Sequence, residues 1–370
     1  EKMIFGGRIP MILILILLGF YVFKWTRELF GNCPALLATF FFSFSPTLIA
    51  HGRLVTTDVG AAAGIFIATY YFIKSLKSPT KKNIIFAGIA FGLAELCKFS
   101  AILLIPFFIF LGLIWWLIKS GKLIKTLKIV ILVFIIGFIL IWPVYQYHTW
   151  NYPPEKQVSD TEVYLADSPK FIKNLILWSA DKPILRPYAH YFTGLFMVFH
   201  RVAGGNTTYF LGEVSNIGWR SYFPTVYLIK IPLAFHILTL IAILYALWLI
   251  KRPFWKDAKK RAMNWLRLHF PEFSMLTFIG LYWVITIAGN LNIGVRHLLP
   301  VFPFIILLVS AMTFYWLKAP HLKIKCFALM ILILWQAVSV VSIYPHFIAY
   351  FNELVGGPSN GYKYVVDSNV

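Results

Sequence analysis

The sequence predicts an all-α polytopic membrane protein, and three observations lead to this fold class. The 370 residues are 59% hydrophobic and only 13% charged, with a mean hydropathy of +0.75. Apolar runs long enough to cross a bilayer, which takes about 20 residues, recur along the whole chain. Short basic segments separate these runs. A soluble domain is about half apolar and a quarter charged, so a conventional soluble core is excluded.

We expect a bundle of about ten helices, which makes residues 1–345 a transmembrane domain and residues 346–370 the start of a C-terminal segment. The stretch 83–118 is divided into two spans because it far exceeds one crossing and because Lys98 stands in its middle. The predicted spans are Ile9–Phe23, Pro34–Ala50, Val59–Ile73, Asn83–Leu96, Ser100–Ile118, Lys128–Tyr145, Thr225–Ile250, Phe273–Asn290, Leu298–Leu317 and Cys326–Tyr344.

Charge predicts the orientation of this bundle, because cytoplasmic loops are rich in lysine and arginine. Five connecting segments hold 20 of the 34 basic residues: Lys24–Cys33, Lys74–Lys82, Lys119–Lys128, Lys251–His269 and Lys318–Lys325. The large loop at 146–224 and the C-terminal segment then lie on the non-cytoplasmic side of a plasma (inner) membrane. The loop is rich in proline and aromatic residues, and we expect short or interfacial helices within it. The net charge of +20 reflects the cytoplasmic loops and does not indicate nucleic-acid binding.

A carboxylate stands at the outer start of the third span. Asp58 follows His51 and Arg53 in the segment SPTLIAHGRLVTTDVG. A carboxylate at membrane depth is costly and is usually paired or functional. Arg53 is the evident partner. The pair either fixes the turn between two spans or helps to build a catalytic site at the outer face.

Several cations belong to the same outer level of the predicted topology. They are Lys98, Arg220, Lys230, Arg296 and His297. Four of them have a structural alternative: an ion pair with Glu95 for Lys98, snorkelling for Lys230, and interfacial anchoring for Arg296 and His297. Together they suit the binding of an anionic lipid headgroup. The three cysteines show no metal-ligand spacing, and no metal ligand is assigned.

Several stretches resemble a known family. The segments are SPTLIAHGRLVTTDVGAAAGIFIATYYF, GLAELCKFSAILLIPF, FLGEVSNIGWRSYFPTVYLIKIP, NIGVRHLLPVFPF and YPHFIAYFNELVGGPSNGYKYVVDSNV. Over nearly the whole chain they resemble the bacterial branch of the protein O-mannosyltransferase-like enzymes (glycosyltransferase family 39, GT-C fold).

The resemblance implies a GT-C-like bundle that transfers a hexose or pentose from a polyprenyl-phosphate donor to a hydroxyl of a protein, lipid or glycan. It implies an inverting displacement with a carboxylate as general base and cations on the departing phosphate. Asp58 is then the catalytic candidate, and the donor-phosphate candidates are Arg53, Lys98, Arg220, Arg296 and His297. No cofactor is required, although a divalent metal stays open.

One departure from the family concerns the first outer loop, in which the family carries its catalytic acidic residue. Glu1 is a poor substitute for that residue, and the usual Asp-Trp-Gly-Gln continuation does not follow Val370. We therefore expect a fragment that is truncated at both ends.

Two other functions compete with the glycosyltransferase. The first is a transporter or flippase of a lipid-linked anionic substrate, which should show internal repeats and polar residues near the bilayer midplane. No repeat is evident, and the ionisable residues gather at one face. The second is a non-catalytic membrane subunit. Neither a GxGxxG motif nor a Walker motif supports a nucleotide site.

Overall fold

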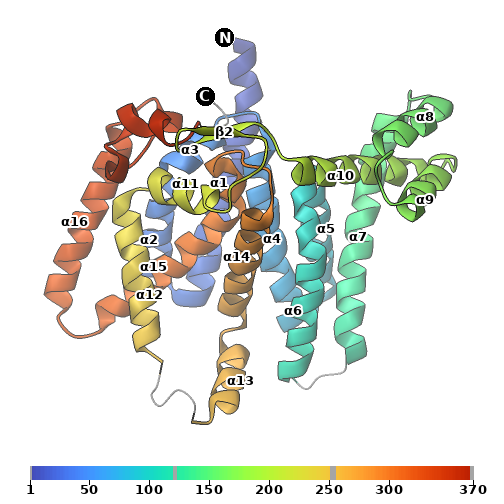
Figure 1. Ribbon diagram of the computed structural model, residues 1–370. Coiled ribbons are helices and arrows are strands. Elements are labelled where there is room, and N and C mark those ends of the chain that lie inside the picture. The colour runs from blue at the N-terminus through green and yellow to red at the C-terminus, as the bar shows by residue number, and fades with distance from the viewer. Residues whose placement is uncertain (1, 120–122, 251–255, 367–370) are drawn as a thin grey trace. The chain divides into compact units, whose positions relative to one another are not determined.

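The computed structural model describes residues 2–119, 123–250 and 256–366, and these are almost entirely helical (Figure 1). Glu1, parts of two basic segments and the last four residues lie outside the described residues. The chain forms two compact units. The first comprises residues 1–67, 207–288 and 292–370, and the second comprises residues 68–206 and 289–291.

Seven helical segments among the described residues are long and apolar enough to cross a membrane, or up to nine if each of two bent pairs counts as one span. The seven are Met3–Phe30, Thr57–Lys77, Phe99–Lys119, Leu123–Thr149, Phe270–Ala288, Val295–Lys318 and Leu322–Val341. Each coincides with a predicted span, so the prediction of a polytopic α-helical membrane protein is confirmed.

The first unit contains most of the helices. They are α1 (Lys2–Phe30), α2 (Asn32–Ser43), α3 (Pro46–Gly52), the start of α4 (Thr57–Lys77), α11 (Tyr222–Lys230), α12 (Leu233–Trp248), α13 (Ala258–Leu268), α14 (Phe270–Ala288), α15 (Phe302–Lys318) and α16 (Leu322–Val341). Its centre is aromatic. The Phe66 ring lies 5.0 Å from Trp25 and 4.9 Å from Phe304, between centroids, which ties α4 to α1 and α15.

Two predicted spans of this unit are each divided into two helices by a sharp bend. The stretch Pro34–Ala50 breaks between α2 and α3, which meet at 62°. The break follows from the sequence, because Pro46 starts α3 and the Ser45 hydroxyl accepts a hydrogen bond from the amide of Leu48, so that a new helix begins there. The stretch Thr225–Ile250 breaks by 112° between α11 and α12, just before Pro232, which has no amide to donate.

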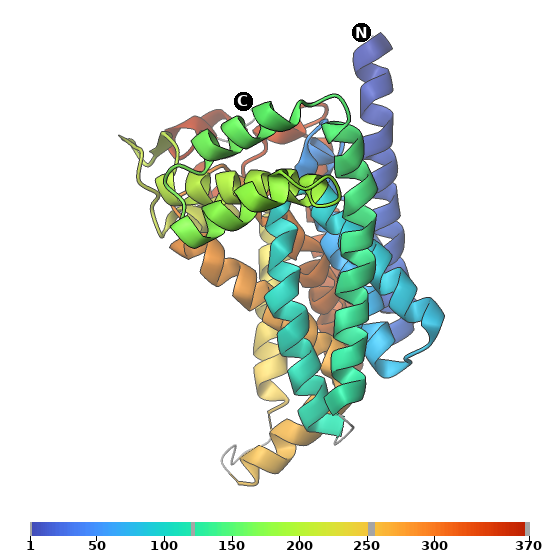
Figure 2. The same ribbon diagram turned by 90° about the vertical axis from the view of Figure 1, so that its right-hand side faces the viewer.

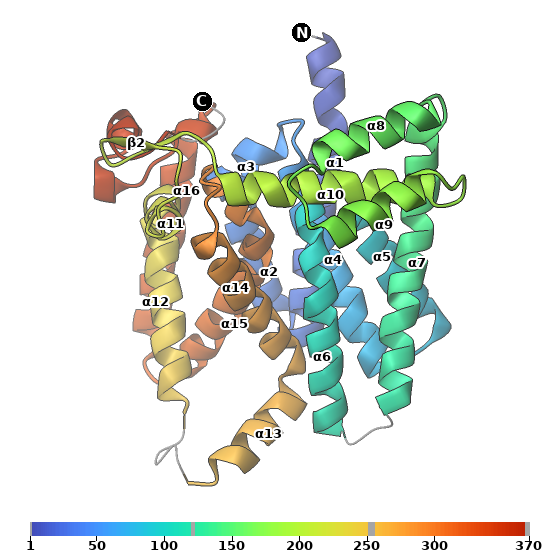
Figure 3. The same ribbon diagram turned by 45° about the vertical axis from the view of Figure 1, so that its right-hand side comes forward.

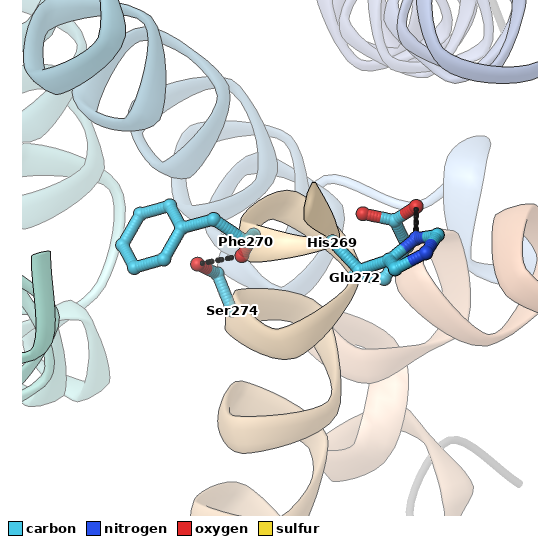
Figure 4. A network of polar contacts seen from close by, with 4 residues as sticks. All are labelled: His269, Phe270, Glu272 and Ser274. Atoms are coloured by element: carbon cyan, nitrogen blue, oxygen red, sulfur yellow. Dashed lines mark hydrogen bonds and ion pairs between the residues drawn. The ribbon is translucent and has the colours of Figure 1, made fainter. Parts of the chain in front are cut away.

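The start of α14 shows how a charged residue is accommodated at a helix end (Figure 4). Glu272 lies in the first turn, where a carboxylate is favoured by the helix dipole. Its Oε1 lies 3.0 Å from Nδ1 of His269, and the Ser274 hydroxyl donates to the carbonyl of Phe270 over 2.7 Å. These contacts stabilise the start of α14, which begins two residues after the end of the basic helix α13.

A small hairpin and the C-terminal segment complete the first unit. Strand β1 (Thr208–Phe210) pairs with β2 (Glu213–Ser215) in antiparallel register. The C-terminal segment forms the 3-10 turns η3 (Phe347–Ala349), η4 (Glu353–Val355) and η5 (Pro358–Lys363). It joins the hairpin, because the amide of Leu211 donates to the carbonyl of Tyr364 over 2.8 Å.

The second unit contains the end of α4 and three further helices of the bundle. These are α5 (Lys81–Cys97), α6 (Leu104–Lys119) and α7 (Leu123–Thr149), with the 3-10 turn η1 (Phe99–Leu103) between α5 and α6. The break at Lys98 confirms the predicted division of the stretch 83–118. At 17 residues, α5 is shorter than the seven long segments.

Helices α5 and α7 pack closely because glycines line their crossing. A Cβ added at Gly92 would lie 2.7 Å from the carbonyl oxygen of Gly137, and one added at Gly88 would lie 2.5 Å from Ile136. Small residues four positions apart allow two membrane helices to approach at backbone distance. This contact therefore sets the position of α7 beside α5.

The long loop is largely helical, as predicted. It contains α8 (Pro154–Tyr164), α9 (Lys170–Ala180) and α10 (Arg186–Gly204). These helices share a small core of Leu165, Ile176, Ala180 and Ala189. Figure 2 shows α8, α9 and α10 running crosswise to α6 and α7 at one end of this unit.

Candidate functional site

Asp58 is the second residue of α4 and is 4% exposed. The first turn of a helix stabilises a carboxylate, because unpaired amides and the helix dipole point towards it. His51 of α3, seven residues earlier, is 1% exposed. Both side chains have interaction partners in the structure. The α3–α4 turn thus holds a buried acid and a buried imidazole.

Arg53 closes α3 and turns towards the C-terminal segment. One guanidinium nitrogen donates to the carbonyl of Pro345 over 3.1 Å, and the group lies 6.0 Å from the centroid of the Phe347 ring. These contacts bind the α3–α4 turn to η3. The pairing of Arg53 with Asp58 stays a prediction.

The loop before α15 is held by buried polar groups. The side-chain carbonyl of Asn292, which is 2% exposed, accepts a hydrogen bond from the amide of Trp219 over 2.8 Å. The backbone carbonyl of Asn292 accepts from the Thr208 hydroxyl over 2.9 Å, and the Tyr222 hydroxyl accepts from the amide of Gly294 over 3.1 Å. These bonds bring the segments of Arg220 and Arg296 together.

The two cations on this loop sit in the 3-10 turn η2 (Val295–Val301). The Nε of Arg296 donates to the carbonyl of Ile293 over 3.3 Å. The His297 ring lies 5.4 Å from Phe223 and 5.8 Å from Tyr282, whose hydroxyl donates to the backbone of His297. The His297 ring is therefore packed between α11 and α14. Interfacial anchoring, the structural alternative for this residue, does not require such packing.

Turn η2 also packs against α3. The first unit therefore gathers three sequence-predicted segments at one end: the turn of Arg53 and Asp58, turn η2 with Arg296 and His297, and exposed Arg220 just before α11. Three arginines, a histidine and a buried carboxylate make this end basic. Such a grouping can hold a phosphate by charge-assisted hydrogen bonds.

Lys98 belongs to the second unit, where it separates α5 from η1 in an extended conformation. The suggested ion pair between Lys98 and Glu95 stays a prediction. The Glu95 side chain is 2% exposed, and its Oε2 accepts a hydrogen bond from the Tyr191 hydroxyl of α10 over 2.7 Å. Burial and the nearby carboxylate both raise the pKa of Tyr191, so this hydroxyl keeps its proton and donates it. The predicted convergence of Lys98 with Arg220 and Arg296 stays a prediction.

Lys230, for which the sequence suggested snorkelling, is instead 3% exposed. Its ammonium donates to the carbonyl of Ile348 over 2.8 Å and lies 4.3 Å from the Phe351 ring centroid. Next to it, the side chain of Asn352 donates to the carbonyls of Leu228 and Ile231 over 2.6 and 2.8 Å. These bonds satisfy the carbonyls freed by the α11–α12 break and dock the C-terminal segment.

The first unit also contains a small apolar pocket. Aromatic and aliphatic side chains of α2, α11, α12 and α15 line most of it, with Ser45 and Gln336 as its polar members. Gln336 is 2% exposed and donates to the carbonyl of Phe44 over 2.6 Å. None of the predicted site residues lines this pocket. Within the described ranges, His, Cys, Asp and Glu side chains form no group of three that could hold a metal ion.

Comparison with known proteins gives a family match for the N-terminal part only. Residues 1–147 match the family described as dolichyl-phosphate-mannose-protein mannosyltransferase. The predicted resemblance to mannosyltransferase-like enzymes is confirmed for this part of the chain, and the assignment to the bacterial branch stays a prediction. No curated protein matches the sequence.

Solved structures with some similarity are oligosaccharyltransferases of Archaeoglobus fulgidus. One is the apo form, with a TM-score of 0.49 and 15% identity over 92% of this chain and 43% of that one. Another is the archaeal oligosaccharyltransferase AglB in complex with an inhibitory peptide and a dolichol-phosphate, with a TM-score of 0.49 and 15% identity over 98% of this chain and 44% of that one. The present chain spans less than half the length of these structures.

Proposed function

We propose that this chain is the membrane-embedded part of a GT-C-type glycosyltransferase that takes a sugar from a polyprenyl-phosphate donor and passes it to a hydroxyl acceptor. The observation that carries the proposal is the match of residues 1–147 to the mannosyltransferase family. The grouping of Arg53, Arg220 and Arg296 at one end of the first unit supports it, because this end supplies the cations that a phosphate donor needs.

The proposed reaction is a single displacement at the anomeric carbon of the sugar. The acceptor oxygen forms a bond to that carbon, and the bond from the carbon to the phosphate oxygen breaks. The proton of the acceptor hydroxyl passes to a carboxylate, for which Asp58 is the candidate in this chain. The leaving group is the polyprenyl phosphate, and neighbouring cations stabilise its charge.

Four cationic side chains of the first unit are proposed to receive this phosphate: Arg53, Arg220, Arg296 and His297. Lys98 belongs to the second unit, and its role as a phosphate ligand stays a prediction from the sequence. An arginine fork can bind two phosphate oxygens at once, whereas a lysine acts as a point charge.

Because Asp58 is buried, an experiment on its role has to separate a structural effect from a catalytic one. A carboxylate that only fixes the α3–α4 turn is expected to be sealed by side chains, and 4% exposure fits that alternative in the present state. A catalytic Asp58 must become accessible when donor and acceptor bind. Stability and transfer therefore have to be measured on the same variant.

Asp58→Asn in the membrane-reconstituted protein is expected to reduce kcat for transfer from a radiolabelled polyprenyl-phosphate sugar by about 10²- to 10⁴-fold, the range of general-base catalysis. The thermal unfolding midpoint in detergent should stay close to that of the parent. Asp167→Asn, an exposed change of the same chemistry, is the control. Transfer by Asp58→Asn at the rate of this control would show that the base lies elsewhere.

A further inference from the structure

Helix α9 has two apolar faces, only one of which the protein covers. Ile176 and Ala180 are buried in the core shared with α8 and α10. On the other face lie Phe171, Leu175 and Trp178, which are 78%, 52% and 56% exposed. Their spacing of four and three residues places them in one stripe along the helix. Three large apolar side chains in a row are unfavourable in water.

Two hydrogen bonds fix how deep this region lies along α7. The indole nitrogen of Trp142 donates to the carbonyl of Ile184, just after α9, over 2.8 Å. The hydroxyl of Tyr188, at the start of α10, donates to the carbonyl of Phe138 over 3.1 Å. Trp142 and Phe138, the two α7 residues in these bonds, lie well before the end of the helix at Thr149. The α9–α10 turn therefore runs beside α7 rather than beyond it.

Helix geometry turns these contacts into a depth. Lys128 is the last charged residue at the start of α7, and about 20 residues of helix cross the hydrocarbon layer, which puts the far boundary near His148. With a rise of about 1.5 Å per residue, Trp142 lies roughly 9 Å and Phe138 roughly 15 Å inside that boundary. The carbonyl of Ile184 and the hydroxyl of Tyr188 are consequently at the level of the acyl chains, below the headgroups.

Charge at the two ends of the stripe agrees with this level. Lys170 begins α9 and Lys182 follows it, and both side chains are exposed. Lysines at such a boundary keep their ammonium groups among the lipid phosphates while their stems lie on apolar surface. Tryptophan, as at 142 and 178, is the residue that gathers at this boundary. Figure 3 shows α9 lying crosswise to α6 and α7, with α8 farther from the first residues of α7 than α9 is.

We propose that α9 is an in-plane membrane anchor. Phe171, Leu175, Trp178 and the neighbouring Ile184 enter the acyl region of the leaflet in which α7 ends. The opposite face of α9 packs on the core that it shares with α8 and α10. The lipid surface is the occupant of the stripe because the bonds to Trp142 and Phe138 hold this region beside α7 at the level of the acyl chains. Ile135 and Ile139 of α7 are likewise 48% and 62% exposed.

The test is electron paramagnetic resonance of single nitroxide labels in the intact chain. Cys33, Cys97 and Cys326 are first replaced by alanine, and a single cysteine is then placed at 171, 175 or 178. The protein is reconstituted into vesicles of phosphatidylethanolamine and phosphatidylglycerol. Power saturation measures collisions with oxygen, which dissolves in lipid, and with a water-soluble nickel chelate. Ile139→Cys is the lipid reference and Glu162→Cys on α8 is the aqueous reference.

All three α9 labels are expected to collide with oxygen as often as the label at 139 does, and with nickel several-fold less often than the label at 162. Nickel collisions equal to those at 162 would place the stripe in water and overturn the proposal. Shielding from both reagents would mean that a protein surface or a second copy covers the stripe, which also overturns it. The substituted side chains are exposed, so the labelled variants are expected to fold. Three independent labels also keep the test valid if one variant fails to insert.

Discussion

Polar residues buried at helix ends determine the chemistry available at one end of the first unit. Asn292, Tyr222 and Asn352 use their hydrogen bonds to hold loops, so the positions of Arg220, Arg296 and the C-terminal segment follow from them. Leaving any of these buried partners unsatisfied costs about 1–3 kcal/mol. The candidate phosphate-binding side chains therefore depend on neighbours that bind no substrate themselves.

Arg296→Ala is expected to raise KM for the polyprenyl-phosphate donor by roughly 10- to 100-fold, because a hydrogen bond to a charged group contributes about 1.5–3 kcal/mol. Steady-state kinetics over a range of donor concentrations measures the change. Arg267→Ala, an exposed arginine on α13, is the matched control. An unchanged KM for Arg296→Ala would exclude this side chain from the donor site.

At the scale of elements, the α5–α7 crossing gives the second unit its geometry. Gly92 has no room for a side chain, because an added Cβ would meet backbone atoms of Gly137 at 2.7 and 3.0 Å. Backbone cannot move aside as a flexible side chain can. The crossing therefore has to widen if Gly92 is replaced.

Gly92→Ala is expected to destabilise the protein by about 1–3 kcal/mol, the usual cost of overpacking. It should lower the thermal unfolding midpoint in detergent by several degrees. Gly280→Ala on α14, where an added Cβ meets nothing within 4 Å, should leave the midpoint unchanged or raise it. Equal midpoints for the two variants would contradict the close packing of α5 on α7.

The sequence predicted the spans better than their bends or their polar contacts. Hydropathy located each long helix, and Lys98 correctly marked the break between α5 and α6. Hydropathy did not reveal the bends at Ser45 and Pro232, since both stretches stay apolar through the break, although Pro46 and Pro232 mark the positions where new helices begin. It also could not reveal that Lys230 bonds Ile348 or that Glu95 bonds Tyr191, because these partners lie about a hundred residues apart. Long-range partners of this kind leave no periodic signal.

For the whole molecule, charge rather than packing predicts which way the chain faces. The basic residues gather in five connecting segments, so those segments are expected on the cytoplasmic side. Labelling of single cysteines at Ser159 and Lys256 with a membrane-impermeant maleimide should report opposite sides of a sealed vesicle. Labelling of both cysteines from the same side would contradict the predicted orientation. It would also contradict an odd number of membrane crossings between residues 159 and 256.

The most direct test of the central claim is transfer by the reconstituted protein from polyprenyl phosphates that carry a labelled hexose or pentose. The account predicts that label leaves the lipid for a hydroxyl acceptor in a membrane extract, that free polyprenyl phosphate forms in equal amount, and that the matching nucleotide sugars give no product. Movement of the intact labelled lipid across the bilayer without release of polyprenyl phosphate would contradict the account and identify a flippase instead.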